Sequence, residues 1–355
     1  MTKVGIIMAG GDGQRFWPNS RKKKPKQFLK LINEKTLLDQ TFRRLSKFIN
    51  PENIYVITSE PQVEVTIESS EFFNSKEKII VEPTARNTAA CIGLATVFVQ
   101  NRFDDAVMFI TPADSYITDM NTYSITANQA IEEAALTDSI VILGIKPSYP
   151  STDYGYIEVD SDASNVMDVV SFREKPNQQT ATECILTNKF YWNSGVFVAK
   201  SSVMEREFKN YLPDTWEILS KISPLLREKQ PDLEEFKSLY NRIEKISIDY
   251  GLIEKVHNLK MIKGTFGWSD LGSWQSLRDY HNLDTNENIK VGPTFGMDVS
   301  NSIFVSESKP IIGLGLEDVL VVNEKDLVFV CGLKHIGKIK EMLAELQKNG
   351  FEDLI

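Results

Sequence analysis

The residues with the clearest capacity for chemistry stand near the N-terminus, where an apolar segment of strand length ends in Gly10, Gly11 and Gly13 and is followed by Arg15. Glycines allow backbone N–H groups to approach a polyphosphate without hindrance from a Cβ atom, and cations neutralise its charge. Seven basic residues and no acidic residue lie between positions 15 and 30, in a chain whose formal net charge is -9. This pattern predicts a phosphate-binding loop. The alternative is a tight turn after a strand, beside a solvated basic surface.

The glycine pattern excludes two commoner phosphate-binding motifs. A dinucleotide-binding fingerprint would need a third glycine where the chain has Phe16, and a P-loop would need Gly-Lys-Ser or Gly-Lys-Thr, which the sequence lacks. The loop therefore belongs to another class of phosphate binder.

Two aspartates in later motifs are candidates for binding a divalent cation. Asp114 follows a predicted strand, and Asp270 lies in a turn flanked by glycines. Mg²⁺ prefers one or two carboxylates together with phosphate oxygens and water. For Asp114, capping of a turn is an equally good explanation. The three histidines and three cysteines are dispersed, so they indicate neither a histidine- or cysteine-based metal site nor a Ser-His-Asp triad.

A second group of motifs has the functional groups that a sugar phosphate requires. Glu174 and Lys175 place a carboxylate for ring hydroxyls beside an ammonium for the phosphate, and the amide of Asn193 can donate and accept hydrogen bonds. Gly155 allows a ligand to approach the backbone closely, although a glycine bulge in a strand would look identical. Asp249 is predicted to cap a helix rather than to bind a ligand.

The segment from Glu82 to Ala89 closes a predicted strand and opens a predicted helix. Guanine presents N1–H and N2–H donors, which the carboxylate of Glu82 could accept. Asn87 and Thr88 are fully explained as the start of the helix, where their side chains can accept the first backbone N–H groups.

Alternating strands and helices must position these residues. Short β-branched runs alternate with amphipathic segments in the first half of the chain, which predicts an α/β fold with a mostly parallel, Rossmann-like sheet and helices on both faces. In such sheets, ligands bind beyond the carboxyl ends of the strands. The predicted strands are Val4–Ala9, Ile54–Thr58, Lys78–Val81, Ala106–Thr111 and Ser139–Ile145, and the predicted helices are Thr36–Phe48, Thr88–Gln100 and Thr122–Leu136.

The composition changes after about residue 285. Short Val- and Ile-rich strands follow one another without intervening helices, and a helix ends the series. We therefore expect a catalytic domain at residues 1–285 and a small β-rich, β-helix-like domain at residues 290–355. The predicted strands of this tail are Val299–Val305, Pro310–Leu314, Val319–Asn323 and Leu327–Val330, followed by a helix at Gly337–Gln347.

The composition also argues against several classes of protein. A net charge of -9 argues against a general binder of nucleic acids or membranes, and no apolar run approaches the ~20 residues that span a bilayer. The N-terminus has only Lys3 before the first strand, unlike a secretory signal. Cys91, Cys184 and Cys331 are predicted to be reduced thiols, so we expect a cytoplasmic protein.

The motifs together resemble one family, the mannose-1-phosphate guanylyltransferases (GDP-mannose pyrophosphorylases). The resemblance covers residues 3–280 as motifs and continues more loosely through the tail. GGxGxR and EKP alone would indicate only the wider class of sugar nucleotidyltransferases, whereas the Trp-Pro, Pro-Lys-Gln-Phe and Arg-Asn-Thr-Ala elements favour the mannose and GTP branch. The motifs, in order, are GGDGQRFWPNSR, KPKQF, EPTARNTA, PAD, YGYI, FREKP, WNSG, SIDYGLIEK and GWSDLGSW.

The resemblance implies a reaction in which GTP and mannose 1-phosphate give GDP-mannose and pyrophosphate with Mg²⁺. It implies that the glycine loop holds the nucleotide and its phosphates, through Gly10, Gly11 and Gly13. The other implied roles are contact with the triphosphate by Arg15 and Lys26, metal binding by Asp114 and Asp270, sugar binding by Gly155, Glu174 and Asn193, sugar-phosphate binding by Lys175, and guanine selection by Glu82, Arg86, Asn87 and Thr88.

The chain departs from the family pattern in one place, since Ser115 stands where histidine usually follows the aspartate of PAD. The difference affects which hydrogen bonds can form around the carboxylate of Asp114, the expected metal ligand. The resemblance is to the short form without the cupin-like isomerase domain, and it implies a homodimer. Two alternatives stay open: a nucleotidyltransferase for another sugar 1-phosphate or nucleotide, and a non-catalytic relative that binds GDP-mannose and regulates an active partner.

Overall fold

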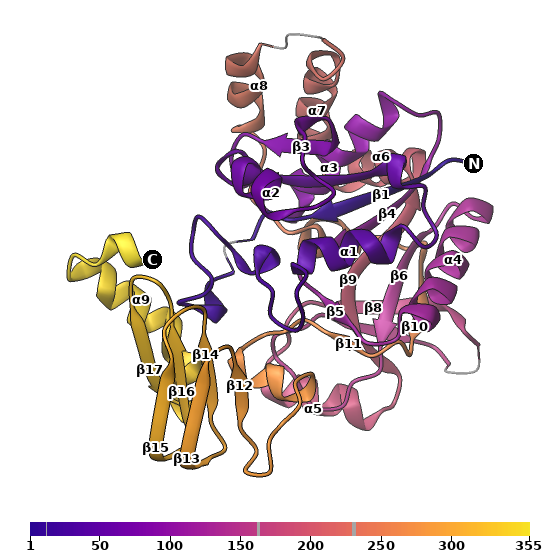
Figure 1. The fold of residues 1–355 in the computed structure, drawn as a ribbon. Helices are drawn as coiled ribbons and strands as arrows, with labels where there is room; N and C mark the ends of the chain where they lie inside the picture. The colour runs from indigo at the N-terminus through magenta and orange to yellow at the C-terminus, as the bar shows by residue number, and fades with distance from the viewer. Residues whose placement is uncertain (12, 162–163, 229–231) are drawn as a thin grey trace. The chain divides into compact units, whose positions relative to one another are not determined.

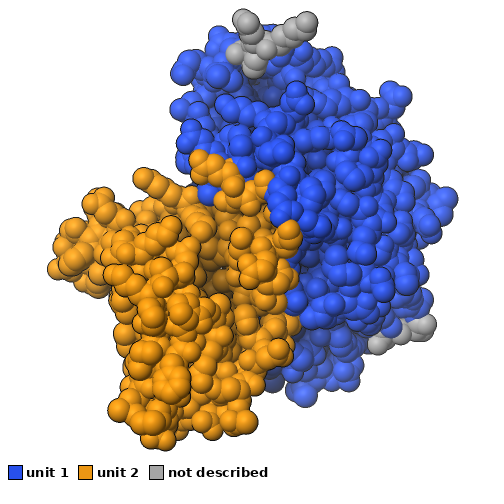
Figure 2. Space-filling view, viewed as in Figure 1, with its two compact units in different colours: residues 1–10, 40–67, 71–269 blue, residues 11–39, 68–70, 270–355 orange. Residues whose placement is uncertain are grey.

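The computed structural model describes residues 1–11, 13–161, 164–228 and 232–355, so Asp12 of the glycine motif lies outside the described residues. The chain divides into two compact units (Figure 2). Unit 1 comprises residues 1–10, 40–67 and 71–269, and unit 2 comprises residues 11–39, 68–70 and 270–355. Unit 2 thus combines the C-terminal tail with the loop that follows the first strand. The division into domains at residues 1–285 and 290–355 stays a prediction.

Unit 1 is built on a mixed sheet (Figure 1). Within the described ranges, nine strands lie in the order β3-β2-β1-β4-β9-β6-β10-β8-β7. The β3-β2-β1-β4 part is parallel, β9 runs antiparallel to both β4 and β6, and β6 and β10 are again parallel. The strands are β1 (Lys3–Met8), β2 (Ile54–Ser59), β3 (Ile79–Glu82), β4 (Val107–Pro112), β6 (Ile140–Ile145), β7 (Tyr156–Val159), β8 (Val166–Arg173), β9 (Phe190–Lys200) and β10 (Leu259–Gly264).

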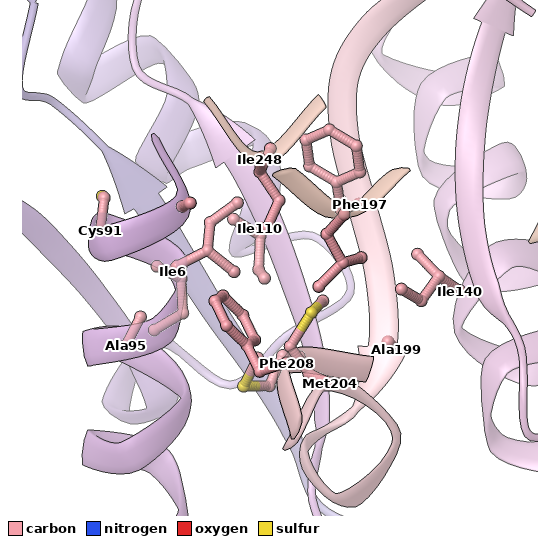
Figure 3. Packing of buried hydrophobic residues seen from close by; sticks show 14 of the residues in the cluster. Ile6, Cys91, Ala95, Ile110, Ile140, Phe197, Ala199, Met204, Phe208 and Ile248 are labelled. Carbon is pink, nitrogen blue, oxygen red and sulfur yellow. The ribbon is translucent and has the colours of Figure 1, made fainter. Parts of the chain in front are cut away.

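Helices cover both faces of this sheet. Alternate residues of a strand point to opposite faces, so each strand can pack against helices on both sides. Ile6 of β1 packs in the large apolar cluster that includes α3 (Asn87–Gln100) and α6 (Ser201–Tyr211) (Figure 3). On the other side of β1, a Cβ atom on Gly5 would meet Leu45 of α1. The remaining helices of unit 1 are α2 (Val63–Ser69), α4 (Met120–Leu136), α5 (Gln178–Leu186), α7 (Pro213–Leu225) and α8 (Leu233–Tyr240), and α1 (Leu37–Leu45) begins in unit 2. These layers confirm the predicted α/β class.

The C-terminal part of unit 2 stacks short parallel strands in successive coils, which confirms the β-helix-like prediction. β14 pairs in parallel with β12 and β16, β13 pairs in parallel with β15, and β17 runs antiparallel to β16. The elements are β12 (Ile289–Val291), β13 (Thr294–Ser300), β14 (Ile303–Ser306), β15 (Ile311–Glu317), β16 (Val319–Asn323), β17 (Val328–Gly332) and α9 (Ile339–Lys348).

The prediction of one continuous strand at Val299–Val305 is wrong. The chain turns between β13 and β14 at Asn301, whose φ is 46°. The side chain of Asn288 bridges this corner, because its Nδ2 donates to the carbonyl of Val299 at 2.8 Å and its Oδ1 accepts from the N–H of Ser302 at 2.9 Å. The hydrogen bonds of Asn288, which belongs to the preceding coil, therefore divide the predicted strand Val299–Val305 into two.

Two further expectations concern the whole chain. Cys91, Cys184 and Cys331 are free thiols, as predicted. In the part of the chain that the structure describes, no helix combines the length and apolar character needed to cross a bilayer.

Candidate active site

The glycine loop has a conformation that requires glycine at one position. Gly13 has a φ of 53°, and a Cβ atom there would lie 2.5 Å from the backbone nitrogen of Lys26. Both facts exclude an ordinary side chain. Gly11 is exposed, and a Cβ atom on it would meet no other atom within 4 Å. A side chain at Gly11 would therefore face open space, whereas Gly13 serves the turn itself.

Aromatic packing within unit 2 anchors this loop. Phe16 is fully buried and contacts Trp274, with ring centroids 5.3 Å apart. Trp17 donates from Nε1 to the carbonyl of Leu354 at 2.8 Å, and its own carbonyl accepts from Nε1 of Trp274 at 3.2 Å. The Trp-Pro element and the second tryptophan of GWSDLGSW thus anchor the chain just after Arg15 and four residues after Asp270.

Three of the predicted charged residues come together in unit 2. The ammonium of Lys26, a buried side chain, donates to the backbone carbonyl of Asp270. A Cβ atom on Gly272 would lie 3.2 Å from Oδ2 of Asp270 and 3.5 Å from Nη1 of Arg15. Gly272 therefore leaves room for the carboxylate of Asp270 and the guanidinium of Arg15 to lie side by side.

Not all of the seven basic residues between positions 15 and 30 are available for a ligand. Arg21 makes two hydrogen bonds of 2.6 Å to the carboxylate of Asp326, in the turn between β16 and β17. This pair raises the pKa of Arg21. Nearby, burial and the charge of Glu307 raise the pKa of Glu324 to about 7, although Lys24 opposes the shift. Asp326 of the tail therefore neutralises Arg21 of the loop.

Glu82 lies inside unit 1 at the end of β3, where it is 4% exposed. Its Oε1 accepts a 2.6 Å hydrogen bond from the hydroxyl of Tyr240, and its Oε2 would lie 3.4 Å from a Cβ atom on Gly10. Burial raises the pKa of Glu82, and the bonds from Tyr240 and Cys91 offset part of that shift. One carboxylate oxygen is thus held by a tyrosine, and the other lies beside the first glycine of the loop.

The start of α3 differs in detail from the prediction. Asn87 has a φ of 68°, and its Oδ1 accepts from the N–H of Thr88 at 2.8 Å. The hydroxyl of Thr88 accepts instead from the N–H of Ile248 at 2.8 Å, so it joins two segments rather than capping its own helix. Nη2 of Arg86 lies 3.5 Å from Oδ1 of Asn241.

Asp114 is half-buried in the loop after β4, and helix α1 fixes that loop from behind. Thr41 Oγ1 donates to the carbonyl of Ala113 at 3.2 Å, and Nη1 and Nη2 of Arg44 each lie 3.5 Å from the carbonyl of Ser115. Arg44 is 2% exposed, and burial lowers its pKa. The backbone on both sides of Asp114 is therefore held by α1, and Ser115, in place of the usual histidine, is itself buried.

The strand register of unit 1 gathers the predicted sugar-binding residues. Tyr156 of β7 pairs with Arg173 of β8 and with Trp192 of β9, so their neighbours Gly155, before β7, Glu174, after β8, and Asn193, within β9, lie beside one another. The N–H of Asn193 donates to the carbonyl of Gly155 at 2.8 Å.

The side chains of this cluster form a connected polar group. A Cβ atom on Gly155 would lie 2.6 Å from Oε2 of Glu174, and Oε1 of Glu174 pairs with Nζ of Lys175 at 2.8 Å. The side chain of Glu174 is 8% exposed and that of Lys175 is 56% exposed. Asn193 Nδ2 donates to Oδ1 of Asp249 at 3.0 Å. Two carboxylates, an amide and a solvent-facing ammonium thus share one site.

Asp249 is a member of this cluster, and its predicted role as a helix cap is wrong. It begins the π-helical turn Asp249–Ile253, and the side chain that accepts from the N–H of Tyr250 belongs to Ser247. Burial, and then repulsion from Glu174, raises the pKa of Asp249 to about 7. Asp249 lies in SIDYGLIEK two residues after Ser247, a serine that can cap, and this was the signal that could have identified Asp249.

Arg44 and Tyr240 were also missed by the sequence analysis. Arg44 interrupts the apolar face of a predicted helix, so a buried cation was the available signal. Tyr240 had no local signal, because its bond to Glu82 joins residues 158 positions apart.

Comparison with known proteins shows which family the chain belongs to. The nucleotidyl transferase family matches residues 4–287. Mannose-1-phosphate guanylyltransferase of Sinorhizobium fredii (strain NBRC 101917 / NGR234) is 34% identical over 97% of this chain and 67% of its own length. Mannose-1-phosphate guanylyltransferase of Escherichia coli is 30% identical over 98% of this chain and 76% of its own length.

Among solved structures, a crystal structure from Thermus thermophilus, described as a mannose-1-phosphate geranyltransferase, superposes with a TM-score of 0.87 at 29% identity. The superposition covers 98% of this chain and 100% of the Thermus thermophilus chain. The chain therefore belongs to the nucleotidyl transferase family and, within it, to the mannose-1-phosphate guanylyltransferases, which are enzymes.

Proposed function

We propose that this enzyme transfers GMP from GTP to mannose 1-phosphate and releases pyrophosphate. The observation that carries the proposal is the cluster of Glu174, Lys175, Asn193 and Asp249 beside Gly155. Carboxylates and an amide suit the hydroxyls of a sugar, and an exposed ammonium suits its phosphate. The names of the relatives, which specify mannose 1-phosphate and guanylyl transfer, support the same substrates.

In this proposal the sugar 1-phosphate is the nucleophile. One of its phosphate oxygens forms a bond to the α-phosphorus of GTP while the bond from that phosphorus to pyrophosphate breaks. The phosphate is already anionic, so no general base is needed. The work of the protein is alignment of the two substrates and stabilisation of charge.

The sugar phosphate is held by the cluster of unit 1. Glu174 and Asn193 bind ring hydroxyls, and Gly155 leaves space for the ring beside the backbone. Lys175 exchanges part of its pairing with Glu174 for the sugar phosphate, since its ammonium is largely exposed and can reach an incoming anion.

The nucleotide is held by the glycine loop and the start of α3. N–H groups at Gly10, Gly11 and Gly13 bind phosphate oxygens, and Arg15 and Lys26 neutralise the triphosphate. The segment that contains Glu82, Arg86, Asn87 and Thr88 selects guanine. The oxygen of Glu82 beside Gly10 supports a role for this carboxylate near the loop.

The donors present fit Mg²⁺ as the metal. Asp114 and Asp270 are half-buried carboxylates, which are hard oxygen ligands. Mg²⁺ takes its remaining ligands from phosphate oxygens and water. Asp114 and Asp270 would hold the ion, which when bound would neutralise phosphate charge.

The test is a pyrophosphate-release assay that crosses GTP, ATP, UTP and dTTP with the 1-phosphates of mannose, glucose and fucose. We expect the pair of GTP and mannose 1-phosphate to give the highest kcat/KM. A higher value for another pair would overturn the substrate assignment, and absence of pyrophosphate with every pair would overturn the catalytic proposal.

A further inference from the structure

The C-terminal end of α8 lies beside the end of β3 in unit 1 (Figure 1). Tyr240 is the last residue of α8, and its hydroxyl donates to Oε1 of Glu82 at 2.6 Å. The next residue, Asn241, accepts through Oδ1 from the hydroxyl of Thr84 at 2.7 Å, and Nη2 of Arg86 lies 3.5 Å from the same oxygen. Two adjacent side chains at the end of one helix therefore hold the segment that leads from β3 to α3 at three points.

The bond between Tyr240 and Glu82 is made inside the protein. Tyr240 is fully buried, and Glu82 is 4% exposed. A hydrogen bond to an ionised group is roughly twice as strong as one between neutral groups. The terminal torsion of a glutamate side chain is broad, so a bond that holds Oε1 also sets the direction of Oε2. That second oxygen is the one beside Gly10, at the start of the glycine loop.

The same bond favours one chemical form of the carboxylate. Donors to a carboxylate stabilise its ionised form, and the bonds from Tyr240 and from the thiol of Cys91 oppose the burial that raises the pKa of Glu82. An ionised carboxylate accepts hydrogen bonds and donates none. Guanine presents two donors, N1–H and the N2 amino group, whereas N1 of adenine is an acceptor. The form of Glu82 that Tyr240 favours therefore suits guanine and opposes adenine.

We propose that Tyr240 is a positioning residue for the recognition of guanine, and that its hydroxyl holds the carboxylate of Glu82 as an oriented acceptor for N1–H and N2–H. This inference rests on the proposed function, in which Glu82 contributes to the selection of guanine. Tyr240 acts through Glu82 and needs no contact with the nucleotide. Asn241 supports the same segment through Thr84 and Arg86, so the end of α8 is a structural part of the nucleotide site.

The test is the ratio of kcat/KM for GTP to kcat/KM for ATP, measured by pyrophosphate release with mannose 1-phosphate in excess. Tyr240→Phe removes one hydroxyl and keeps the ring. We expect it to lower the ratio about 10-fold, which corresponds to one hydrogen bond to a charged group. The KM for mannose 1-phosphate should stay unchanged. A role in packing alone would lower the unfolding temperature without changing the ratio for the two nucleotides.

A double-mutant cycle tests whether the tyrosine acts through the carboxylate. Glu82→Ala should itself lower the ratio, and adding Tyr240→Phe to Glu82→Ala should lower it no further, because residues that act as one unit are not additive. Tyr55→Phe is the matched control. Tyr55 is a buried tyrosine of the same apolar cluster, but it lies near the amino end of β2, whereas Glu82 pairs with the last residue of that strand. We expect Tyr55→Phe to leave the ratio unchanged, and thermal unfolding checks that each variant is folded.

The outcomes separate this inference from the function on which it rests. A wild type that prefers GTP, with the same ratio in Tyr240→Phe, would overturn the inference alone. An equal effect of Tyr240→Phe with and without the carboxylate of Glu82 would also overturn it, because the tyrosine would then act by another route. A wild type with no preference for GTP over ATP would overturn the proposed selection of guanine and this inference with it.

Discussion

Replacing Gly155 by alanine tests the proposed sugar site through a steric change that the structure specifies. A Cβ atom there would lie 2.6 Å from Oε2 of Glu174 and 2.8 Å from Cζ of Phe172. Favourable contacts between such atoms lie at about 3.5–4.0 Å, so both contacts must lengthen by roughly 1 Å. Phe172 is 7% exposed and packed in the core cluster, so the carboxylate of Glu174 is the group that we expect to move further.

A displacement of roughly 1 Å in a substrate-positioning group can lower a rate by about 10²-fold. We therefore expect Gly155→Ala to lower kcat/KM for mannose 1-phosphate about 100-fold. The KM for GTP should change little, because the substitution does not touch Gly11, Arg15 or Lys26. The free energy of unfolding should fall by about 1–3 kcal/mol, which is the usual cost of overpacking.

The measurement is steady-state pyrophosphate release with each substrate varied in turn, together with thermal unfolding. Gly337→Ala is the matched control, because a Cβ atom on Gly337 would meet nothing within 4 Å. An unchanged kcat/KM for mannose 1-phosphate in Gly155→Ala, or equal losses for both substrates, would refute the assignment of this cluster to the sugar.

Three further predictions concern other parts of the site. Asp114→Asn should lower Mg²⁺-dependent turnover by about 10²–10³-fold while leaving the unfolding temperature unchanged, and wild-type turnover would contradict the metal assignment. Asp249 has a pKa raised to about 7 in the folded protein, so the stability that its protonation contributes is fully present below about pH 4 and is lost as the pH rises to about 7. Asp249→Asn should remove that loss in denaturant unfolding at pH 5 and pH 8, and an unaltered pH dependence would count against it. Gly13→Ala should lower the free energy of unfolding by about 1–3 kcal/mol because of its positive φ and the 2.5 Å approach to Lys26, whereas Gly11→Ala should not. Equal stability of these two variants would show that the loop adapts to a side chain.

Long elements with clear periodicity were predicted closely from the sequence. The helix expected at Thr88–Gln100 is observed at Asn87–Gln100, and the helix expected at Thr122–Leu136 is observed at Met120–Leu136. The break inside Val299–Val305 was not predictable from local pattern, because it depends on hydrogen bonds from the side chain of Asn288, which is distant in the sequence.

The sequence by itself determined which chemical groups the protein has and their order along the chain. The local sequence was sufficient for this, because the apolar strand β1 and the glycine turn at Gly13 each involve residues that are close together in the sequence. The ordered motifs were likewise enough to assign the family, because each motif is a short contiguous segment.

The tertiary structure decided which of these groups meet and in what state of ionisation. Gly155, Glu174 and Asn193 lie together because β7, β8 and β9 pair in one register. Asp249 has a raised pKa because folding buries it near Glu174. Strand register and burial arise from contacts between distant segments, so the spacing of residues along the chain does not contain them.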